Sequence, residues 1–181
     1  MRQLNVFNFT TLNGYYKGPQ EDIGWHSHGG PENEYGVEAM KANSTLVFGR
    51  VTYEMMSSYW PTPDAIKNMP EMAKGMNEAE KIVFSKTLKK ADWNNTTIIK
   101  DINEMATLKK GNGPDMTILG SGSIITQLAG LIDTYQIMID PIALGDGTPM
   151  FKGMKTPLHL ELVDTKTFKS GVILLSYQRI P

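Results

Sequence analysis

Apolar and polar positions along the chain predict strands and helices in alternation. Residues 4–9 alternate between apolar and polar side chains, which is the pattern of a half-buried strand. Other short apolar runs predict further strands at 46–48, 81–85, 96–99, 116–119 and 134–139. Helical patterns follow many of these runs, and we expect helices at 31–43, 52–59, 102–108 and 123–131.

The C-terminal third has a different pattern. Residues 158–168 and 172–177 both alternate, and Ser170-Gly171 lies between them, so we expect an antiparallel hairpin. The segment 64–79 is polar and interrupted by Pro70 and Gly75, and we expect a loop with a helical turn at most. The sequence therefore predicts one α/β domain over residues 1–181, with a mixed sheet.

A long glycine-rich segment, residues 10–30, separates the first strand from the first helix. Connections longer than about 12–15 residues are often lids or binding loops. Trp25, His26 and His28 lie inside this segment. A His-x-His pair on a loop can bind a metal, but an ordinary polar loop is the favoured interpretation, and we predict no metal site.

Two strand-to-helix junctions carry the pattern of phosphate-binding sites. The strand 46–48 ends at Gly49 and is followed by Arg50, Val51 and Thr52, where a helix begins. Free backbone N–H groups at such a helix start can bind an anion, and Arg50 adds positive charge. The strand 116–119 runs similarly into Gly120-Ser121-Gly122-Ser123. Two such junctions suggest a ligand with several phosphates, such as a dinucleotide.

Composition and motif searches narrow the range of functions. The net charge of -1 gives no broad field to attract nucleic acid or anionic membrane, and no cysteine is present. No apolar run approaches the roughly 20 residues of a membrane span, and the N-terminus lacks a signal-peptide core, so we expect a cytoplasmic protein. Ile125 replaces the third glycine of G-x-G-x-x-G, which disfavours a standard Rossmann domain, and no G-x-S-x-G elbow supports a serine hydrolase.

The motifs together match a known pattern. The chain resembles the dihydrofolate reductase-like family, and more closely its branch that contains the reductase domain of the bacterial riboflavin-biosynthesis deaminase/reductase. The resemblance covers nearly the whole chain and rests on the motifs Thr11-Leu12-Asn13-Gly14, Phe48-Gly49-Arg50-Val51-Thr52-Tyr53-Glu54, Lys81-Ile82-Val83-Phe84-Ser85-Lys86-Thr87, Leu119-Gly120-Ser121-Gly122-Ser123 and Asp140-Pro141-Ile142-Ala143-Leu144-Gly145-Asp146-Gly147.

This resemblance implies a mostly parallel mixed sheet flanked by helices, with an antiparallel end, that binds NADPH across its carboxyl edge. It implies cofactor phosphates at Gly49, Arg50, Val51 and Thr52, an adenosine 2′-phosphate near Ser85 and Lys86, and the pyrophosphate at Gly120, Ser121, Gly122 and Ser123. Candidate catalytic residues are Glu34 and Asn13, and candidate substrate contacts are Thr10, Gly14, Trp25 and Tyr53. Asn13 stands where the branch often has aspartate.

The leading hypothesis is therefore an NADPH-dependent reductase that transfers a hydride to a pterin, a pyrimidine or a related heterocycle. The required proton would come from a carboxyl group such as Glu34 or from water. The rival hypothesis is a non-catalytic protein that binds a nucleotide or a heterocycle on the same fold. We also expect a homodimer, with the apolar strands Ile137–Ile139 and Val172–Leu175 as candidate edges for pairing.

Overall fold

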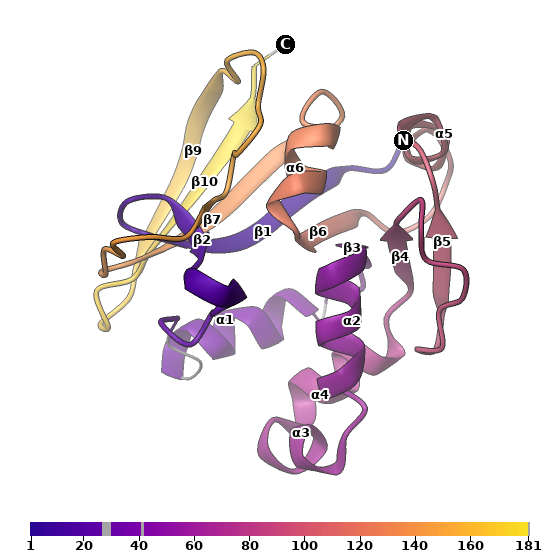
Figure 1. Cartoon of the computed structure of the whole chain (residues 1–181), viewed down its shortest axis with the longest axis horizontal. Coiled ribbons are helices and arrows are strands. Elements are labelled where there is room, and N and C mark those ends of the chain that lie inside the picture. The colour runs from indigo at the N-terminus through magenta and orange to yellow at the C-terminus, as the bar shows by residue number, and fades with distance from the viewer. Residues whose placement is uncertain (27–29, 41, 181) are drawn as a thin grey trace.

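A central eight-stranded sheet organises the computed structural model, which describes residues 1–26, 30–40 and 42–180 (Figure 1). Its strand order is β5-β4-β3-β6-β1-β7-β10-β9. The strands are β1 (Leu4–Thr11), β3 (Thr45–Gly49), β4 (Lys81–Phe84), β5 (Thr96–Ile99), β6 (Met116–Gly120), β7 (Thr134–Asp140), β9 (Leu160–Thr167) and β10 (Ile173–Arg179).

Most of the sheet is parallel. β1 pairs in parallel with both β6 and β7, while β3 pairs in parallel with β6 and β4, and β4 with β5. Among the described strands of this sheet, β10 alone forms antiparallel pairs, with β7 on one side and with its hairpin partner β9 on the other. The expected mixed sheet with an antiparallel C-terminal hairpin is confirmed. The carboxyl ends of five neighbouring parallel strands, β4, β3, β6, β1 and β7, consequently share one edge.

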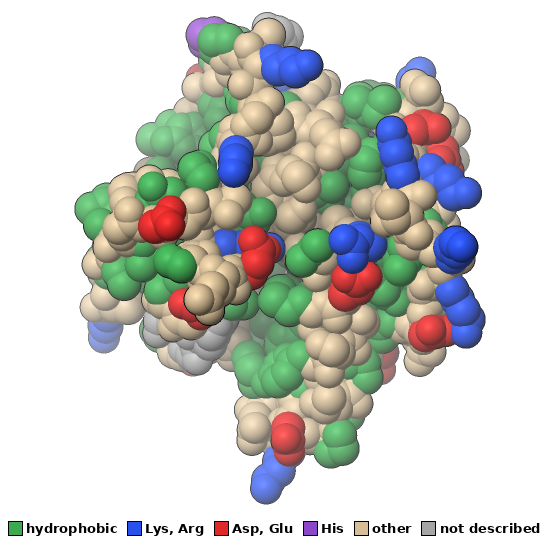
Figure 2. Space-filling model, viewed as in Figure 1, with side chains coloured by type: hydrophobic (Ala, Val, Ile, Leu, Met, Phe, Trp, Pro, Cys, Tyr) green, Lys and Arg blue, Asp and Glu red, His purple; other side chains and the backbone are tan. Residues whose placement is uncertain are grey.

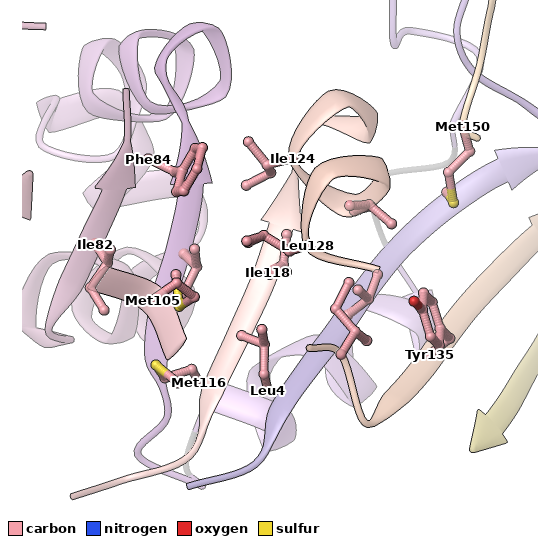
Figure 3. Close-up of a cluster of buried hydrophobic side chains, with 14 of the residues drawn as sticks. Leu4, Ile82, Phe84, Met105, Met116, Ile118, Ile124, Leu128, Tyr135 and Met150 are labelled. Carbon is pink, nitrogen blue, oxygen red and sulfur yellow. The ribbon is translucent and has the colours of Figure 1, made fainter. Parts of the chain in front are cut away.

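Helices cover both faces of the sheet. They are α1 (Gly30–Met40), α2 (Arg50–Tyr59), α3 (Pro63–Asn68), α4 (Pro70–Glu78), α5 (Ile102–Lys110) and α6 (Gly122–Leu128). Ile124 and Leu128 of α6 belong to one buried cluster with Ile118 and Phe84 of the sheet (Figure 3). On the opposite face, α1, α2 and α4 contribute side chains to a second cluster around Phe48.

The expectation of a loop over residues 64–79 was wrong, because this segment forms α3 and α4. Pro63 and Pro70 each stand in the first turn of a helix, where the missing N–H of proline has no intrahelical partner to lose. The side chain of Thr62 caps α3 by accepting a hydrogen bond from Ala65 N at 3.2 Å. The prolines therefore begin these helices and do not interrupt them.

The first loop also contains structure that its composition did not predict. β2 (Tyr15–Lys17) pairs with β8 (Thr148–Pro149) as a second, two-stranded sheet, and a short 3₁₀ helix follows at Pro19–Glu21. The loop is thereby attached to the segment that follows β7. His28 falls outside the described residues.

The strands proposed as dimer edges are not edges. Ile137–Ile139 lies in β7 and Ile173–Leu175 in β10, and both strands are paired on both sides. β9 is an edge strand instead, and its Leu162 and Val163 are 51% and 54% exposed. A homodimer stays a prediction, without support from the strands first named.

The surface has no dominant charge on the face shown in Figure 2, where acidic and basic side chains are interspersed. Within the described part of the chain, no helix combines the length and the apolar character that crossing a lipid bilayer requires.

Lys81 is a buried cation next to the second cluster, the one around Phe48. It is 1% exposed, and its Nζ donates hydrogen bonds to the carbonyl oxygens of Asn77 (3.1 Å), Ala79 (2.7 Å) and Asn94 (3.1 Å). The Nζ also lies 4.5 Å from the centroid of the Trp93 ring. Burial lowers the pKa of Lys81 to about 8 from 10.5.

This pKa predicts a pH-dependent stability. Between pH 8 and 10.5 the unfolded chain still holds the Lys81 proton while the folded chain has lost it, so the free energy of unfolding should rise with pH by up to about 3 kcal/mol. Urea unfolding at several pH values in this window would measure the slope. Lys81→Met should remove that contribution to the slope; an identical slope in the variant and the wild type would contradict the assignment.

Candidate active site

A cleft of about 310 Å³ lies at the carboxyl edge of the sheet, where β3, β4 and β6 end. It brings together three segments that the sequence had singled out separately. Its lining consists of Gly49, Arg50, Val51, Phe84, Ser85, Lys86, Ser121, Ser123, Ile124 and Gln127. The cleft thus combines two cations, three hydroxyl groups and the start of α2.

The start of α2 is open to an anion. Gly49 is the N-cap residue, and no side chain caps the first N–H groups of this ten-residue helix. Arg50 is half-exposed and pairs with Glu54 one turn later, at 2.8 Å between Nη1 and Oε2. A Cβ atom at Gly49 would lie 2.9 Å from Ser121 Oγ, so the absence of a side chain lets the ends of β3 and β6 approach closely.

The end of β4 forms a compact turn. Ser85 is buried, and its Oγ accepts hydrogen bonds from Thr87 N at 3.2 Å and Leu88 N at 3.0 Å. Lys86 is exposed beside it at the rim of the cleft. The serine therefore shapes the turn that presents the lysine to the cleft.

The junction after β6 is tightly packed. The peptide bond between Gly120 and Ser121 is cis. The hydroxyls of Ser121 and Ser123 are hydrogen-bonded at 2.7 Å. A Cβ atom at Gly122 would lie 2.5 Å from the carbonyl oxygen of Met150 and 3.0 Å from the Tyr16 ring, so this glycine admits the close approach of β2 and of the residue that follows β8. Its missing side chain therefore serves packing against protein.

A buried amide donor lies next to the same junction. Asn8 is 5% exposed, its Oδ1 accepts from Phe9 N, and its Nδ2 has no hydrogen-bond partner among the described residues. A Cβ atom at Gly120 would lie 3.8 Å from this Nδ2 and 3.2 Å from Thr52 Oγ1. The sequence carried a signal for it, because Asn8 follows Leu4 and Val6 on the same buried face of β1 and brings an amide to that face.

Asn13 and Gly14 lie in the turn after β1. Asn13 Nδ2 donates to the carbonyl of Leu144 at 2.7 Å, and its Oδ1 accepts from Thr11 Oγ1 at 2.8 Å and Leu144 N at 3.2 Å. Gly14 accepts a backbone hydrogen bond from Met150 N at 3.1 Å. These contacts fix the turn to the segment after β7, and Thr10 is buried in β1 beside it.

Tyr53 lies elsewhere. It is buried with Phe48 and Trp93, its hydroxyl accepts from Trp93 N at 3.1 Å, and it lines a second cleft of about 570 Å³ beside α2. Glu34 is exposed on α1. The buried carboxylate of α1 is Glu32, which accepts a hydrogen bond from Ser170 in the turn between β9 and β10.

Sequence reasoning missed a buried pair at the end of β7. Asp140 is 3% exposed, and its Oδ2 lies 2.9 Å from Nδ1 of His26, which is 8% exposed. The two residues are 114 positions apart, so no local spacing could connect them. His26 stacks on Phe9 of β1, and Trp25 lies edge-on to both rings.

Comparison with known proteins shows the family. Residues 2–174 match the RibD C-terminal domain. The chain belongs to the RibD C-terminal domain family. A relative in this comparison is the uncharacterized protein YyaP of Bacillus subtilis (strain 168), which is 30% identical over 171 residues, covering 92% of this chain and 89% of YyaP. The resemblance inferred from the motifs is confirmed.

Solved structures show the same fold. A putative riboflavin biosynthesis protein from Shewanella sp. PV-4 matches with a TM-score of 0.78 and 22% identity, covering 99% of both chains. Dihydrofolate reductase from Enterococcus faecalis, complexed with NADP(H), matches with a TM-score of 0.63 and 15% identity, covering 99% of this chain and 97% of that one. This RibD C-terminal domain family member therefore has a dihydrofolate reductase-like, reductase-type fold.

The packing at Gly122 predicts a sharp sensitivity to one methyl group. Gly122→Ala should lower the free energy of unfolding by about 1–3 kcal/mol, because the new Cβ meets a backbone carbonyl that cannot rotate away. Gly130→Ala is the matched control, since nothing lies within 4 Å of a Cβ there, and it should change stability by less than about 0.5 kcal/mol. Denaturant unfolding measures both, and equal effects would rule out the close approach to Met150.

Proposed function

We propose that this protein is an NADPH-dependent reductase of a flat heterocyclic substrate. The observation that carries the proposal is the cleft that joins the start of α2, the turn at Ser85 and Lys86, and the serines after β6. Hydroxyls, backbone N–H groups and cations in one cleft form the donor set that phosphate oxygens require. The spread of these donors over three strand ends suits a ligand with several phosphates.

Each segment has a proposed task in holding the cofactor. The uncapped N–H groups of α2 would bind the pyrophosphate, with Ser121 and Ser123 on its other side. Lys86 would pair with a 2′-phosphate, which distinguishes NADPH from NADH. When bound, NADPH supplies a hydride to the substrate.

The residues beside Gly120 fit such a ligand as well. Asn8 Nδ2 is a donor without a protein partner in the described part of the chain, and Thr52 Oγ1 lies close to the same glycine. A buried donor without a partner costs stability and is usually retained for a reason. A carbonyl or phosphate oxygen of the cofactor would satisfy it.

The comparisons support the proposal at the level of family and fold. The Shewanella protein of the same fold is described as a putative riboflavin biosynthesis protein, and the E. faecalis dihydrofolate reductase of this fold was solved with NADP(H). A pterin, a pyrimidine or a related ring is the substrate class that these names suggest.

One observation favours a second candidate, a binding protein without turnover. The side chain of Asn13, a candidate catalytic residue, is committed to Thr11 and to the backbone of Leu144. Glu34, the other candidate, is exposed on α1. Oxidation of NADPH, followed by its absorbance with a panel of pterins, pyrimidines and flavins, separates the two functions. Turnover with any of them supports the reductase, and binding of NADPH with no turnover supports the binding protein.

The cofactor assignment predicts a selective effect at Lys86. Lys86→Ala should weaken NADPH binding by about tenfold and leave NADH binding unchanged, because only NADPH carries the 2′-phosphate. Lys89→Ala removes an exposed lysine outside the cleft and should change neither affinity. Thermal-shift titration with each nucleotide gives the affinities. Failure of both nucleotides to stabilise the wild type would reject the reductase proposal.

A further inference from the structure

Phe9 near the end of β1, Asp140 at the end of β7 and Trp25 of the first loop hold one flat ring in a closely defined position. Phe9 stacks on the imidazole of His26, with ring centroids 3.8 Å apart and planes 3° from parallel. Asp140 Oδ2 lies 2.9 Å from His26 Nδ1, in the direction of an in-plane N–H. Trp25 stands edge-on to the stack, with its centroid 5.7 Å from Phe9 and 6.0 Å from His26. The imidazole of His26 is therefore held by the stacked ring of Phe9, the acceptor oxygen of Asp140 and the edge-on ring of Trp25.

These contacts suit any flat ring that carries an N–H in its plane, and they do not require histidine. Asp140 is nearly inaccessible to water, and a buried carboxylate needs a donor to compensate for lost hydration. Any flat ring with an N–H in its plane could donate to Asp140 and cover the face of Phe9 in the same way. Nitrogen heterocycles of the size of a pyrimidine or a pterin have both properties.

The acceptor and the stacking face belong to a rigid frame, whereas the imidazole comes from the long loop. Thr11 of β1 pairs with Asp140 of β7, and Leu12 N donates to the carbonyl of Ile142 at 2.8 Å just beyond. Asn13 adds its hydrogen bonds to Leu144. His26 lies in the first loop, between the 3₁₀ helix and α1.

The position of Phe9 and Asp140 along the sheet also suits a substrate site. Counted from β4, the sheet order is β3, β6, β1 and β7, so Phe9 and Asp140 follow directly after the strands that line the cofactor cleft. A ligand bound along this edge from Lys86 to Ser121 would therefore end next to Phe9 and Asp140. A substrate ring has to lie beyond that end of the cofactor.

We propose that Phe9, Trp25 and Asp140 form the binding site for the substrate's flat heterocyclic ring, and that the imidazole of His26 fills this site in the present conformation. This inference rests on the proposed reductase function and names its substrate site. A nitrogen heterocycle with an in-plane N–H displaces His26, stacks on Phe9 and donates to Asp140. His26 then competes with every ligand of the site.

Benzimidazole is a suitable probe, because it is flat and carries one ring N–H, and 1-methylbenzimidazole is its matched control without the N–H. Calorimetric titration in the absence of NADPH should show that His26→Ala binds benzimidazole at least about tenfold more tightly than the wild type, since the competing imidazole is gone. His26→Ala should prefer benzimidazole to the methylated control by about tenfold. His159→Ala removes an exposed histidine and should behave as the wild type.

The role of Asp140 is tested in the same background. Asp140→Leu combined with His26→Ala keeps a side chain of similar size but removes both acceptor oxygens, and it should abolish the preference for the N–H probe. Circular dichroism verifies that each variant is folded. An NMR titration of the wild type covers the case in which a variant does not fold: the His26 ring-proton signals, shifted by the Phe9 ring, should move toward exposed values as benzimidazole is added, while those of His159 stay constant.

The outcomes separate this inference from the reductase proposal. Equal benzimidazole affinity in the wild type and His26→Ala, equal affinity for the two probes, or His26 signals that do not move at high probe concentration would each overturn the inference. None of these results involves NADPH. Probe binding without any stabilisation by NADPH would retain the ring site and reject hydride transfer.

Discussion

The parallel alignment of β4, β3, β6, β1 and β7 is the constraint on which the rest of this structure depends. Parallel strands deliver their carboxyl ends to the same edge, so residues that leave those strands meet there whatever their separation in sequence. Gly49, Ser85 and Ser121 gather in one cleft for this reason. Along this edge, the sheet order places the cations near β4 at one end and the aromatic and acidic residues of β1 and β7 at the other.

The glycines at this edge have two different physical tasks. At Gly49 the missing side chain lets the end of β3 approach Ser121, which defines the width of the cleft. At Gly122 the space is already filled by the carbonyl of Met150 and the ring of Tyr16. A glycine pattern that predicts ligand binding from the sequence is thus partly required by protein packing. The same local geometry meets both the need for a cleft and the need for close packing.

Local rules made most of the fold predictable from the sequence. The buried strands are short apolar runs, and Asp101 caps α5 by accepting hydrogen bonds from Asn103 N and Glu104 N, which are only two and three positions away. α3 and α4 were missed because a proline begins a helix or breaks one according to its position, which residues 64–79 alone did not reveal. The cleft at the carboxyl edge of the sheet could be anticipated from strand-to-helix motifs. The contact between His26 and Asp140 could not, since it forms only when the loop folds over the sheet.

The central position of β1 has a consequence for how the chain acquires its structure. β1 is the first strand in sequence, yet its two neighbours, β6 and β7, come from Met116–Gly120 and Thr134–Asp140. More than a hundred residues must therefore be synthesised before the middle of the sheet can close. Such non-local pairing makes folding slow and leaves the apolar side chains of β1 exposed in the nascent chain. β1, which carries Phe9 of the proposed ring site, therefore waits for its partners while more than a hundred further residues are synthesised.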